Sequence, residues 1–394
     1  MAKRSESTML RVHKIKLNPN QAQASYFAKS CGVARHAYNW ALAEWKRQYE
    51  AGEKPNEAAL RKLYNSIKPV EFPWALEVTK CAPQQAIKNA GRAYKNFFDR
   101  LKKGKKGAEV GYPTFKKKGV HDSFRADNGP ATKGANAVPV DGKKIRLPII
   151  GWVRMREAVR FCGTVQSTTV SRMADGWHIC VLVETADTLK AKRNGATVGV
   201  DLGLTRFATT SEGEFIIGPK PHRALGKRLR RLNQSLSRKT KGSANFRKAK
   251  AKLSKLHKRI AAIRQDAVHK LTHRLVTEYS VIGIEDLNVK GMARKGRLGR
   301  SVGDAGMRMF RTQIDYKAAM TGAFVYTHPG FAPSSKVCSD CGQIHDMPLG
   351  KSVLKCDCGL VIDRDLNAAL VLKSAASSAV SACGENGSGV ALAA

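Results

Sequence analysis

Three acidic residues at the ends of predicted strands and helices constrain the fold of this chain most. Asp201 ends the apolar run TVGVD, and Glu285 ends the apolar run SVIGIE. Asp365 lies far along the chain, directly before the helical pattern LNAAL. A carboxylate at the end of a buried strand is costly unless it is paired or binds a metal. We therefore expect the three acids to meet at one site, although Asp201 alone also fits a turn residue and Glu285 alone a helix cap.

The order of the predicted elements indicates which fold would bring the acids together. Strands at 197–202, 205–210 and 214–217 are followed by helices, the strand with Glu285, a basic loop over 290–300, a helix over 304–320, the strand GAFVYTHPG and the helix with Asp365. This is the order of a ribonuclease H-like α/β fold, in which such positions sit together. Converging carboxylates suit Mg²⁺, which prefers oxygen ligands. Two such ions can clamp the attacking water and the leaving oxygen of a phosphodiester.

A cluster of cysteines predicts a second, structural metal site. Four of the nine cysteines fall within one short segment, namely Cys338, Cys341, Cys356 and Cys358. Thiolates on two short knuckles can converge on one tetrahedral Zn²⁺, which would close a lobe too small for a core of its own. The second knuckle is CxC, one residue tighter than the usual CxxC, so His345 is an alternative ligand. The competing reading is four cysteines clustered by chance.

The charge of the chain indicates a polyanionic partner. It carries 70 Lys and Arg against 31 Asp and Glu, a formal net charge of +39. Such an excess destabilises a compact state through self-repulsion, and nucleic acid is its commonest partner. The segment 225–265 has 15 Lys or Arg and no acid. Its leucine spacing predicts a helical hairpin, whose nucleic-acid-binding candidates are Arg228, Arg231, Lys252 and Lys255. A merely solvated basic surface is the other reading.

The sequence argues against a membrane or secreted protein. The N-terminal MAKRSESTMLRVHKIKL lacks the apolar segment of a signal peptide, and no apolar run approaches membrane-spanning length. No amphipathic anchor helix is evident, which disfavours a membrane surface as the polyanion. The remaining cysteines are too scattered for a disulfide framework. We expect a cytoplasmic, nucleoid-associated protein with neither a membrane nor a small-molecule partner.

The N-terminal half divides into a β and a helical part. LRVHKIKLNP (10–19) alternates as a strand, and helical spacing follows up to Gly52 and again over 78–104. From about 120 to 187 three β-branched runs are separated by turns. We expect 1–19 and 120–190 to form a small barrel into which 20–119 is inserted as a helical lobe.

The ordered set of motifs resembles a known family. GVDLG, GIEDL, SSKVCSDCG, CDCG and DRDLNAAL, with a basic hairpin between the first two, resemble TnpB, the OrfB-type protein of bacterial insertion sequences related to type V CRISPR effectors. NPNQAQASYFAKSCGVARHAYNWAL, AYKNFF and YPTFKKK in the N-terminal half also look like that family. The resemblance covers most of the chain except its small-residue tail.

The resemblance implies a transposon-associated, RNA-guided DNA endonuclease whose partners are a guide RNA and target double-stranded DNA. It implies a wedge barrel (1–19 and 120–190), a helical recognition lobe (20–119), a RuvC-like nuclease domain (195–330 and 361–380), a zinc-binding lobe (331–360) and a flexible tail (381–394). The catalytic, Mg²⁺-binding acids would be Asp201, Glu285 and Asp365, with Asp363 an exposed or helix-entry acid. Gln84 would contact a short target-adjacent motif, while base pairing supplies sequence specificity.

Three alternatives remain at this stage. A nuclease-inactive RNA-guided repressor would lack one or more of the acids, all of which are present. A DNA transposase would use the acids for strand transfer but gives the N-terminal half no obvious role. A zinc-ribbon RNA-binding protein without chemistry would leave the acids at the strand ends unexplained.

Overall fold

The computed structural model describes residues 8–127, 137–186, 195–294, 298–330, 332, 334–348 and 350–385. The chain divides into two compact units, Met1–Asp187 and Thr188–Ala394. Within the described ranges, every helix is too short or too polar to cross a membrane.

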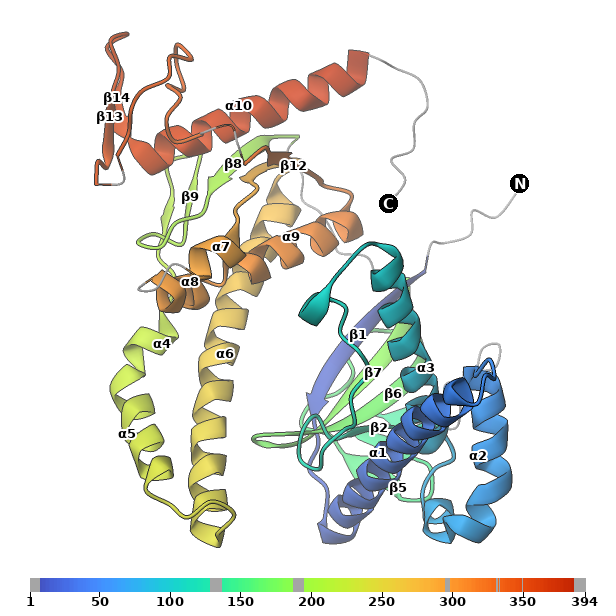
Figure 1. Ribbon diagram of the computed structural model, residues 1–394. Helices are drawn as coiled ribbons and strands as arrows, with labels where there is room; N and C mark the ends of the chain where they lie inside the picture. Colours follow the sequence, from blue (N-terminus) through green and yellow to red (C-terminus); the bar gives the residue numbers. More distant parts are fainter. Residues whose placement is uncertain are drawn as a thin grey trace. The chain divides into compact units, whose positions relative to one another are not determined.

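Two antiparallel sheets form the β part of the first unit (Figure 1). The larger sheet has, in spatial order, β1 (Met9–Lys16), β7 (Gly176–Thr185), β6 (Thr164–Met173) and β2 (Ser123–Arg125). The smaller sheet contains β3 (Val140–Asp141), β4 (Lys144–Leu147) and β5 (Gly151–Arg154). A bridge between Leu17 and Met155 joins the two sheets. The residues expected to form a small barrel therefore form two joined sheets, and β1 pairs along its whole length with β7.

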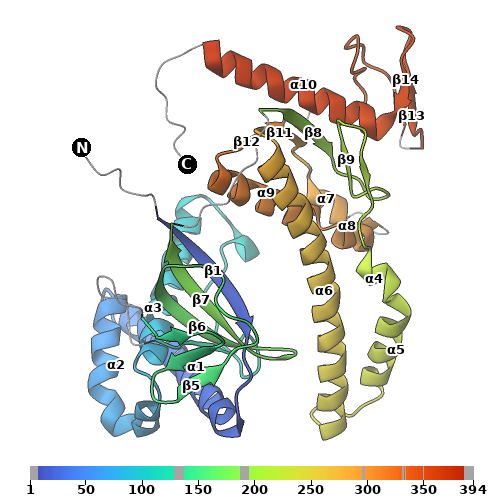
Figure 2. The same ribbon diagram turned by 180° about the vertical axis from the view of Figure 1, so that it is seen from behind.

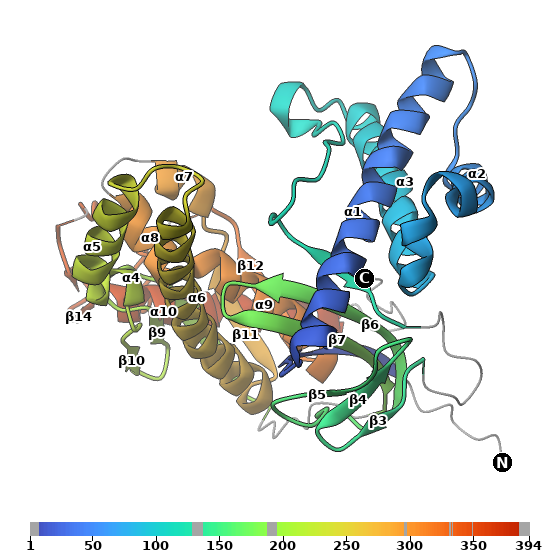
Figure 3. The same cartoon turned by 90° about the horizontal axis from the view of Figure 1, so that it is seen from below.

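Three helices are inserted between β1 and β2: α1 (Gln21–Glu50), α2 (Glu57–Glu71) and α3 (Cys81–Lys102) (Figure 3). Asn20 begins α1 with a capping box, in which its side chain accepts a hydrogen bond of 2.8 Å from the Gln23 backbone N–H. Short 3₁₀ turns follow at Pro73–Glu77 and Gly107–Glu109. The sequence did not predict α2, because it buries only Leu60 and Tyr64 and contains Pro69.

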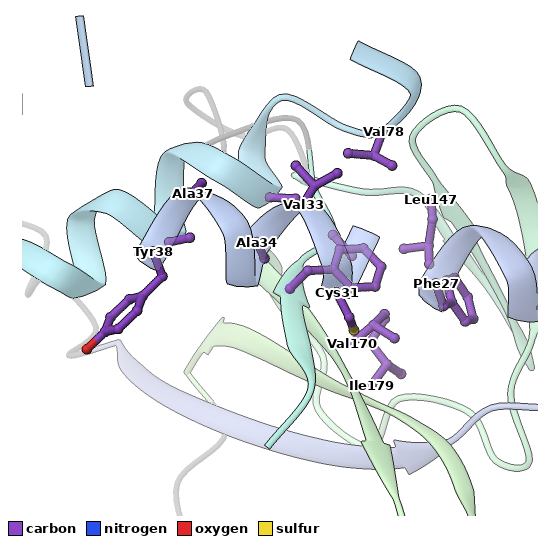
Figure 4. Close-up of a cluster of buried hydrophobic side chains, with 14 of the residues drawn as sticks. Phe27, Cys31, Val33, Ala34, Ala37, Tyr38, Val78, Leu147, Val170 and Ile179 are labelled. Atoms are coloured by element: carbon purple, nitrogen blue, oxygen red, sulfur yellow. The ribbon is translucent and has the colours of Figure 1, made fainter. Parts of the chain in front are cut away.

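One hydrophobic core joins the helices and sheets of this unit (Figure 4). Phe27 and Cys31 on α1 pack among the fully buried Val170 of β6 and Ile179 of β7. Burial raises the pKa of the Cys31 thiol to about 12, so this cysteine behaves as an apolar core residue.

A five-stranded mixed sheet forms the centre of the second unit (Figures 1 and 2). Its spatial order is β10 (Phe215–Ile216), β9 (Ala208–Thr210), β8 (Thr197–Asp201), β11 (Val281–Glu285) and β12 (Phe324–His328). Strands β8, β11 and β12 run parallel to one another, whereas β9 pairs antiparallel with both β8 and β10. The strands expected from the sequence are all present.

Helix α10 (Arg364–Glu385) packs closely on one face of this sheet. A Cβ atom added to Gly199 of β8 would lie 1.8 Å from the Ala369 carbonyl oxygen, and one added to Gly283 of β11 would lie 2.3 Å from that of Leu372. Only glycine allows the helix backbone this close. The helix is therefore fixed across both strands.

Helices α6 (Ala244–Glu278) and α9 (Met307–Thr321) share a core with the alternate residues of the same strands. Val198, Val200, Ile282 and Ile284 are buried in that core. The N-terminal half of α6 pairs with α5 (Gly226–Ser237), which follows the short α4 (Pro221–Ala224), as the predicted basic hairpin. Leu229, Leu253, Leu256 and Ile260 form its narrow apolar seam.

Two expectations for this unit were wrong. The segment expected as a basic loop over 290–300 contains α7 (Val289–Arg294) and the start of α8 (Gly299–Ala305), and the next helix begins at Met307 because Gly306 adopts φ 71°. The predicted flexible tail (381–394) begins within a helix, since α10 continues to Glu385. The rest of the predicted flexible tail lies outside the described residues.

Candidate active site and metal centre

Asp201, Glu285 and Asp365 lie at one edge of the five-stranded sheet. Asp201 and Glu285 are the last residues of the neighbouring parallel strands β8 and β11, so both sit at the carboxyl edge. Asp365 is in the first turn of α10, one turn before the Ala369 carbonyl that contacts Gly199. The close helix–sheet packing thus places Asp365 over the two strand ends.

The electrostatics of Asp201 indicate that the three carboxylates interact. Desolvation raises the pKa of Asp201 to about 7, and the negative charges of Glu285 and Asp365 contribute to the rise. The oxygens of the three carboxylates lie farther apart than the four cysteine sulfurs. Among the described residues, only the cysteine cluster has all its ligand atoms within 4.8 Å of one another. Two ions lie about 3.5–4 Å apart in a two-metal site, so its ligands need not all touch one another.

Asp363 has a different role from Asp365. Its Oδ1 accepts hydrogen bonds from the backbone N–H groups of Asp365 at 3.0 Å and Leu366 at 3.2 Å, as a helix-capping residue does. Its Oδ2 lies 2.8 Å from Nη1 of Arg206, which is 4.0 Å from Oδ2 of Asp365. Its place at the start of α10 agrees with the predicted helix-entry position, and Arg206 was not singled out from the sequence.

Two further residues that sequence reasoning missed connect the acids to the cysteine lobe. Ser334, which is fully buried, donates a short hydrogen bond to Oε1 of Glu285. Asn367 is also fully buried; its amide donates to the Val337 carbonyl at 2.6 Å, and its Oδ1 accepts from the Ser339 N–H at 2.9 Å. The only sequence signals were a Ser-Ser pair before the first knuckle and a polar residue in an apolar helix.

The four cysteines converge as predicted. The Sγ atoms of Cys338 and Cys358 are 3.8 Å apart, and those of Cys341 and Cys356 are 3.4 Å apart. The hairpin β13 (Val353–Lys355) and β14 (Val361–Asp363) carries the second pair in its turn. All four thiols fit one tetrahedral ion, so the tighter CxC spacing does not prevent convergence.

His345 lies beside this cluster. Its Nε2 is 3.1 Å from Sγ of Cys356. Because four thiols already converge, His345 is placed to hydrogen-bond the Cys356 sulfur without being one of the four converging groups.

The nucleic-acid-binding candidates lie apart from the acids along the chain. Arg228 and Arg231 on α5 and Lys252 and Lys255 on α6 are all exposed on the basic hairpin. Gln84 is half-buried in the first turn of α3 in the other unit. The exposure of the four basic residues leaves them available for phosphate contacts.

Three family profiles match consecutive parts of the chain. A profile described as "Probable transposase" (OrfB_IS605) matches residues 178–296, and a Cas12f1-like TNB domain profile matches 308–372. A "Helix-turn-helix domain" profile of the same OrfB family matches 9–54, where the structure has β1 and one long helix, α1.

Curated relatives match nearly the whole chain. A protein of Streptomyces pristinaespiralis named "Putative RNA-guided DNA endonuclease" is 34% identical over 95% of this chain and 91% of its own length. "Putative RNA-guided DNA endonuclease InsQ" of Escherichia coli is 32% identical over 95% of this chain and 94% of its own length. The solved structure of a Cas12f1–sgRNA–target DNA complex has a TM-score of 0.61 at 12% identity, covering 93% of this chain and 99% of that one, which shows a shared fold.

Proposed function

The chain belongs to the TnpB family of OrfB-type proteins, and on that premise we propose that it is an RNA-guided DNA endonuclease that cleaves DNA complementary to a bound guide RNA. The observation that carries the nuclease proposal is the meeting of Asp201, Glu285 and Asp365 at one sheet edge, with the pKa of Asp201 raised to about 7. Three interacting carboxylates repel one another, and a bound cation would offset that repulsion.

The three acids would hold Mg²⁺, because their oxygens are the ligands that this ion prefers. A pair of bound Mg²⁺ ions supplies charge stabilisation to the attacking water and the leaving oxygen of the phosphodiester. Asp201 must give up its proton to act as a ligand, and Ser334 holds Oε1 of Glu285 in place by its hydrogen bond. Arg206 and Arg364 bring positive charge to Asp365, at 4.0 Å and 3.8 Å, and so moderate the repulsion among the acids.

The cysteine cluster would hold one structural Zn²⁺. Desolvation acts to raise the pKa of Cys338, but hydrogen bonds from the backbone N–H groups of Cys341 and Asp340, together with those from the Cys356 and Cys341 thiols, lower the pKa to about 7. Such N–H groups favour the thiolate that Zn²⁺ requires. A structural role is supported because, among the described residues of the lobe, the core beside Cys338 and Cys356 consists of the buried Met347 and Leu354.

The remaining domains take the roles that the family suggests. The sheets of 1–19 and 120–190 would form the wedge and the helices of 20–119 the recognition lobe, with Gln84 near the target-adjacent motif. The RuvC-like nuclease would comprise 195–330 and 361–380, interrupted by the zinc lobe at 331–360. Arg228, Arg231, Lys252 and Lys255 would bind nucleic-acid phosphates by charge, which implies a salt-dependent affinity.

The alternative functions differ in whether they require the three acids and a guide RNA. A nuclease-inactive repressor has no need for three interacting acids, and a zinc-ribbon RNA-binding protein has no need for them either. A transposase would use the acids, but would require no RNA.

The decisive experiment purifies the protein with its RNA and sequences that RNA. A duplex matching the identified guide, flanked by a randomised motif library, is then incubated with Mg²⁺ or with EDTA. We expect Mg²⁺-dependent cutting of duplexes that carry one short motif. Cutting that persists after the RNA is removed would contradict the guided mechanism.

A further inference from the structure

A cleft of about 900 Å³ opens in the second unit, lined in part by the loop that follows Asp201. One wall is the loop 203–207, which begins two residues after Asp201. The other walls are α4 with the start of α5, and α8, which follows Glu285 along the chain. The loop 203–207 leaves the carboxyl end of β8, and the chain reaches α8, by way of α7, from the carboxyl end of the parallel strand β11. The cleft therefore lies toward the same sheet edge as the acids, where open α/β sheets bind ligands.

The charge of the cleft is strongly positive. Arg223 of α4, Arg230 of α5 and Arg300 of α8 line it with exposed side chains. None of these three arginines has an ion-pair partner within the described part of the chain. Lys220 adds a fourth cation, and its Nζ donates to the Thr205 carbonyl at 2.8 Å across the cleft wall. Three arginines without an ion-pair partner among the described residues therefore line one cleft, and guanidinium matches the geometry of a phosphate.

The single acid in the lining does not offset this charge. Asp304 is 7% exposed, and its carboxylate accepts hydrogen bonds from the backbone N–H groups of His222 at 2.9 Å and Arg223 at 3.0 Å. It also lies 3.5 Å from the Arg264 guanidinium of α6. Asp304 therefore ties α8 to α4 and α6, so the cleft is preformed rather than assembled by its ligand.

The uncharged lining favours a sugar-phosphate backbone over a planar ligand. Thr205, Asn233 and Ser301 offer hydroxyl and amide groups. Phe207 is the one Phe, Tyr or Trp among the lining residues, and it is only 4% exposed. Grooves that bind single-stranded nucleic acid combine cations along the phosphate backbone with exposed aromatic faces on which the bases stack. This cleft has the cations but no exposed Phe, Tyr or Trp face.

We propose that this cleft binds the phosphate backbone of a single DNA strand next to the phosphodiester that the acidic site cuts. The assignment to DNA rests on the proposed nuclease function. A nucleic-acid strand held in the cleft would continue toward Asp201, and DNA is the proposed substrate there. The cleft would hold the strand by charge, independently of its base sequence.

A salt titration tests the proposal without requiring cutting. The full protein with its co-purified RNA carries Asp201→Asn to prevent cleavage and is titrated with a labelled, non-complementary oligothymidine at several salt concentrations. Replacing Arg223, Arg230 and Arg300 together by Gln removes three phosphate contacts. The slope of log affinity against log salt should fall by about 2, because each single-strand contact contributes about 0.7. The triple Arg→Lys variant should keep most of the slope.

A matched variant controls for general loss of charge. Lys239→Gln, Lys241→Gln and Lys248→Gln remove three exposed cations from the far end of the basic hairpin. This control should leave the oligothymidine slope unchanged. An unchanged slope in the cleft variant, an equal fall in both triples, or a loss of guide-RNA affinity in place of DNA affinity would each overturn the proposal. If the wild type cuts no DNA while the cleft slope still falls, the nuclease proposal fails and the binding site stands.

Discussion

The Oδ1 atom of Asn367, on helix α10, accepts a hydrogen bond of 2.9 Å from the backbone N–H of Ser339, inside the first cysteine knuckle. The same side chain donates to the Val337 carbonyl, and it is fully buried. Asn367 lies two residues after Asp365. The buried amide of Asn367 therefore joins the cysteine lobe to the helix that carries Asp365.

Replacing Asn367 by Leu should release the knuckle from the helix. It leaves the partly buried Ser339 N–H and Val337 carbonyl without these partners, which costs up to about 1–3 kcal/mol for each group. We expect a lower free energy of unfolding and faster release of zinc to a chelator, measured by denaturant titration and a colorimetric zinc indicator. Ser378→Ala on the exposed side of the same helix is the control. If both variants release zinc at the wild-type rate, Asn367 does not join the two parts.

Removing one thiol tests the metal centre directly. Cys356→Ser should reduce the bound zinc from one ion per chain toward none, because a structural site needs four ligands. Atomic absorption on the purified protein measures this. Cys162→Ser, an exposed cysteine outside the cluster, should keep its zinc. Full zinc occupancy in Cys356→Ser would point to His345 as the fourth ligand.

The pKa of Asp201 predicts a pH-dependent stability difference. Its folded-state pKa, about 7, exceeds the ordinary value of 3.8, so the native state binds the proton more tightly. The stability that protonated Asp201 contributes is lost as the pH rises through 7, because the carboxyl group ionises more readily in the unfolded state than in the native state. Asp201→Asn should therefore be more stable than the wild type at pH 8 without divalent metal, by up to about 4 kcal/mol.

The advantage of Asp201→Asn should shrink toward pH 5, where Asp201 is protonated in the native state. Thermal melts at both pH values measure it, and Mg²⁺ should raise the melting temperature of the wild type but not of the variant. An equal difference at the two pH values would mean that Asp201 is not held near the other acids.

Asp363 and Asp365 should differ in their mutational effects. Asp365→Ala should abolish cutting and leave target binding intact. Asp363→Ala removes the cap of α10 and the partner of Arg206, which should cost about 0.5–2 kcal/mol of stability. Asp363→Ser, which keeps a capping oxygen, should recover most of that stability. If Asp363→Ala abolishes cutting in a fully folded protein, its role is catalytic.

The contact of Gly199 with α10 should tolerate no side chain. Gly199→Ala places a Cβ against the Ala369 carbonyl, so the helix must move away from β8. We expect a loss of about 3 kcal/mol, at the upper end of typical overpacking costs. Gly303→Ala on α8 meets nothing within 4 Å and should be neutral or slightly stabilising. Equal melting temperatures for the two variants would contradict the close packing.

The sequence predicted that Asp201 and Glu285 end β-strands, because a strand and its last residue can be recognised from a short local pattern. Val198 and Val200 alternate as in a β-strand, and Asp201 ends the run. The order of the elements along the chain then indicates the fold. Helix α10 was likewise evident from its apolar spacing. That Asp365 lies over the strand ends depends on the contact of α10 with Gly199 and Gly283, which no local pattern specifies.

Features that depend on tertiary contacts were missed. Helix α2 buries only two side chains and contains Pro69, so its periodicity is weak. Short α7 and α8 lie in a basic, glycine-rich segment that favours a loop by composition. Ser334, Asn367 and Arg206 are ordinary polar residues in the sequence, and only their partners across the fold reveal what they hold.

The most direct test of the central claim is single-turnover cutting of a guide-matched duplex with Mg²⁺, compared among the wild type and the Ala variants of Asp201, Glu285 and Asp365. The account predicts that each variant binds the target with wild-type affinity and cuts it at less than about one thousandth of the rate, since loss of a metal ligand removes several kcal/mol of transition-state stabilisation. Wild-type cutting by any of the three variants would contradict it.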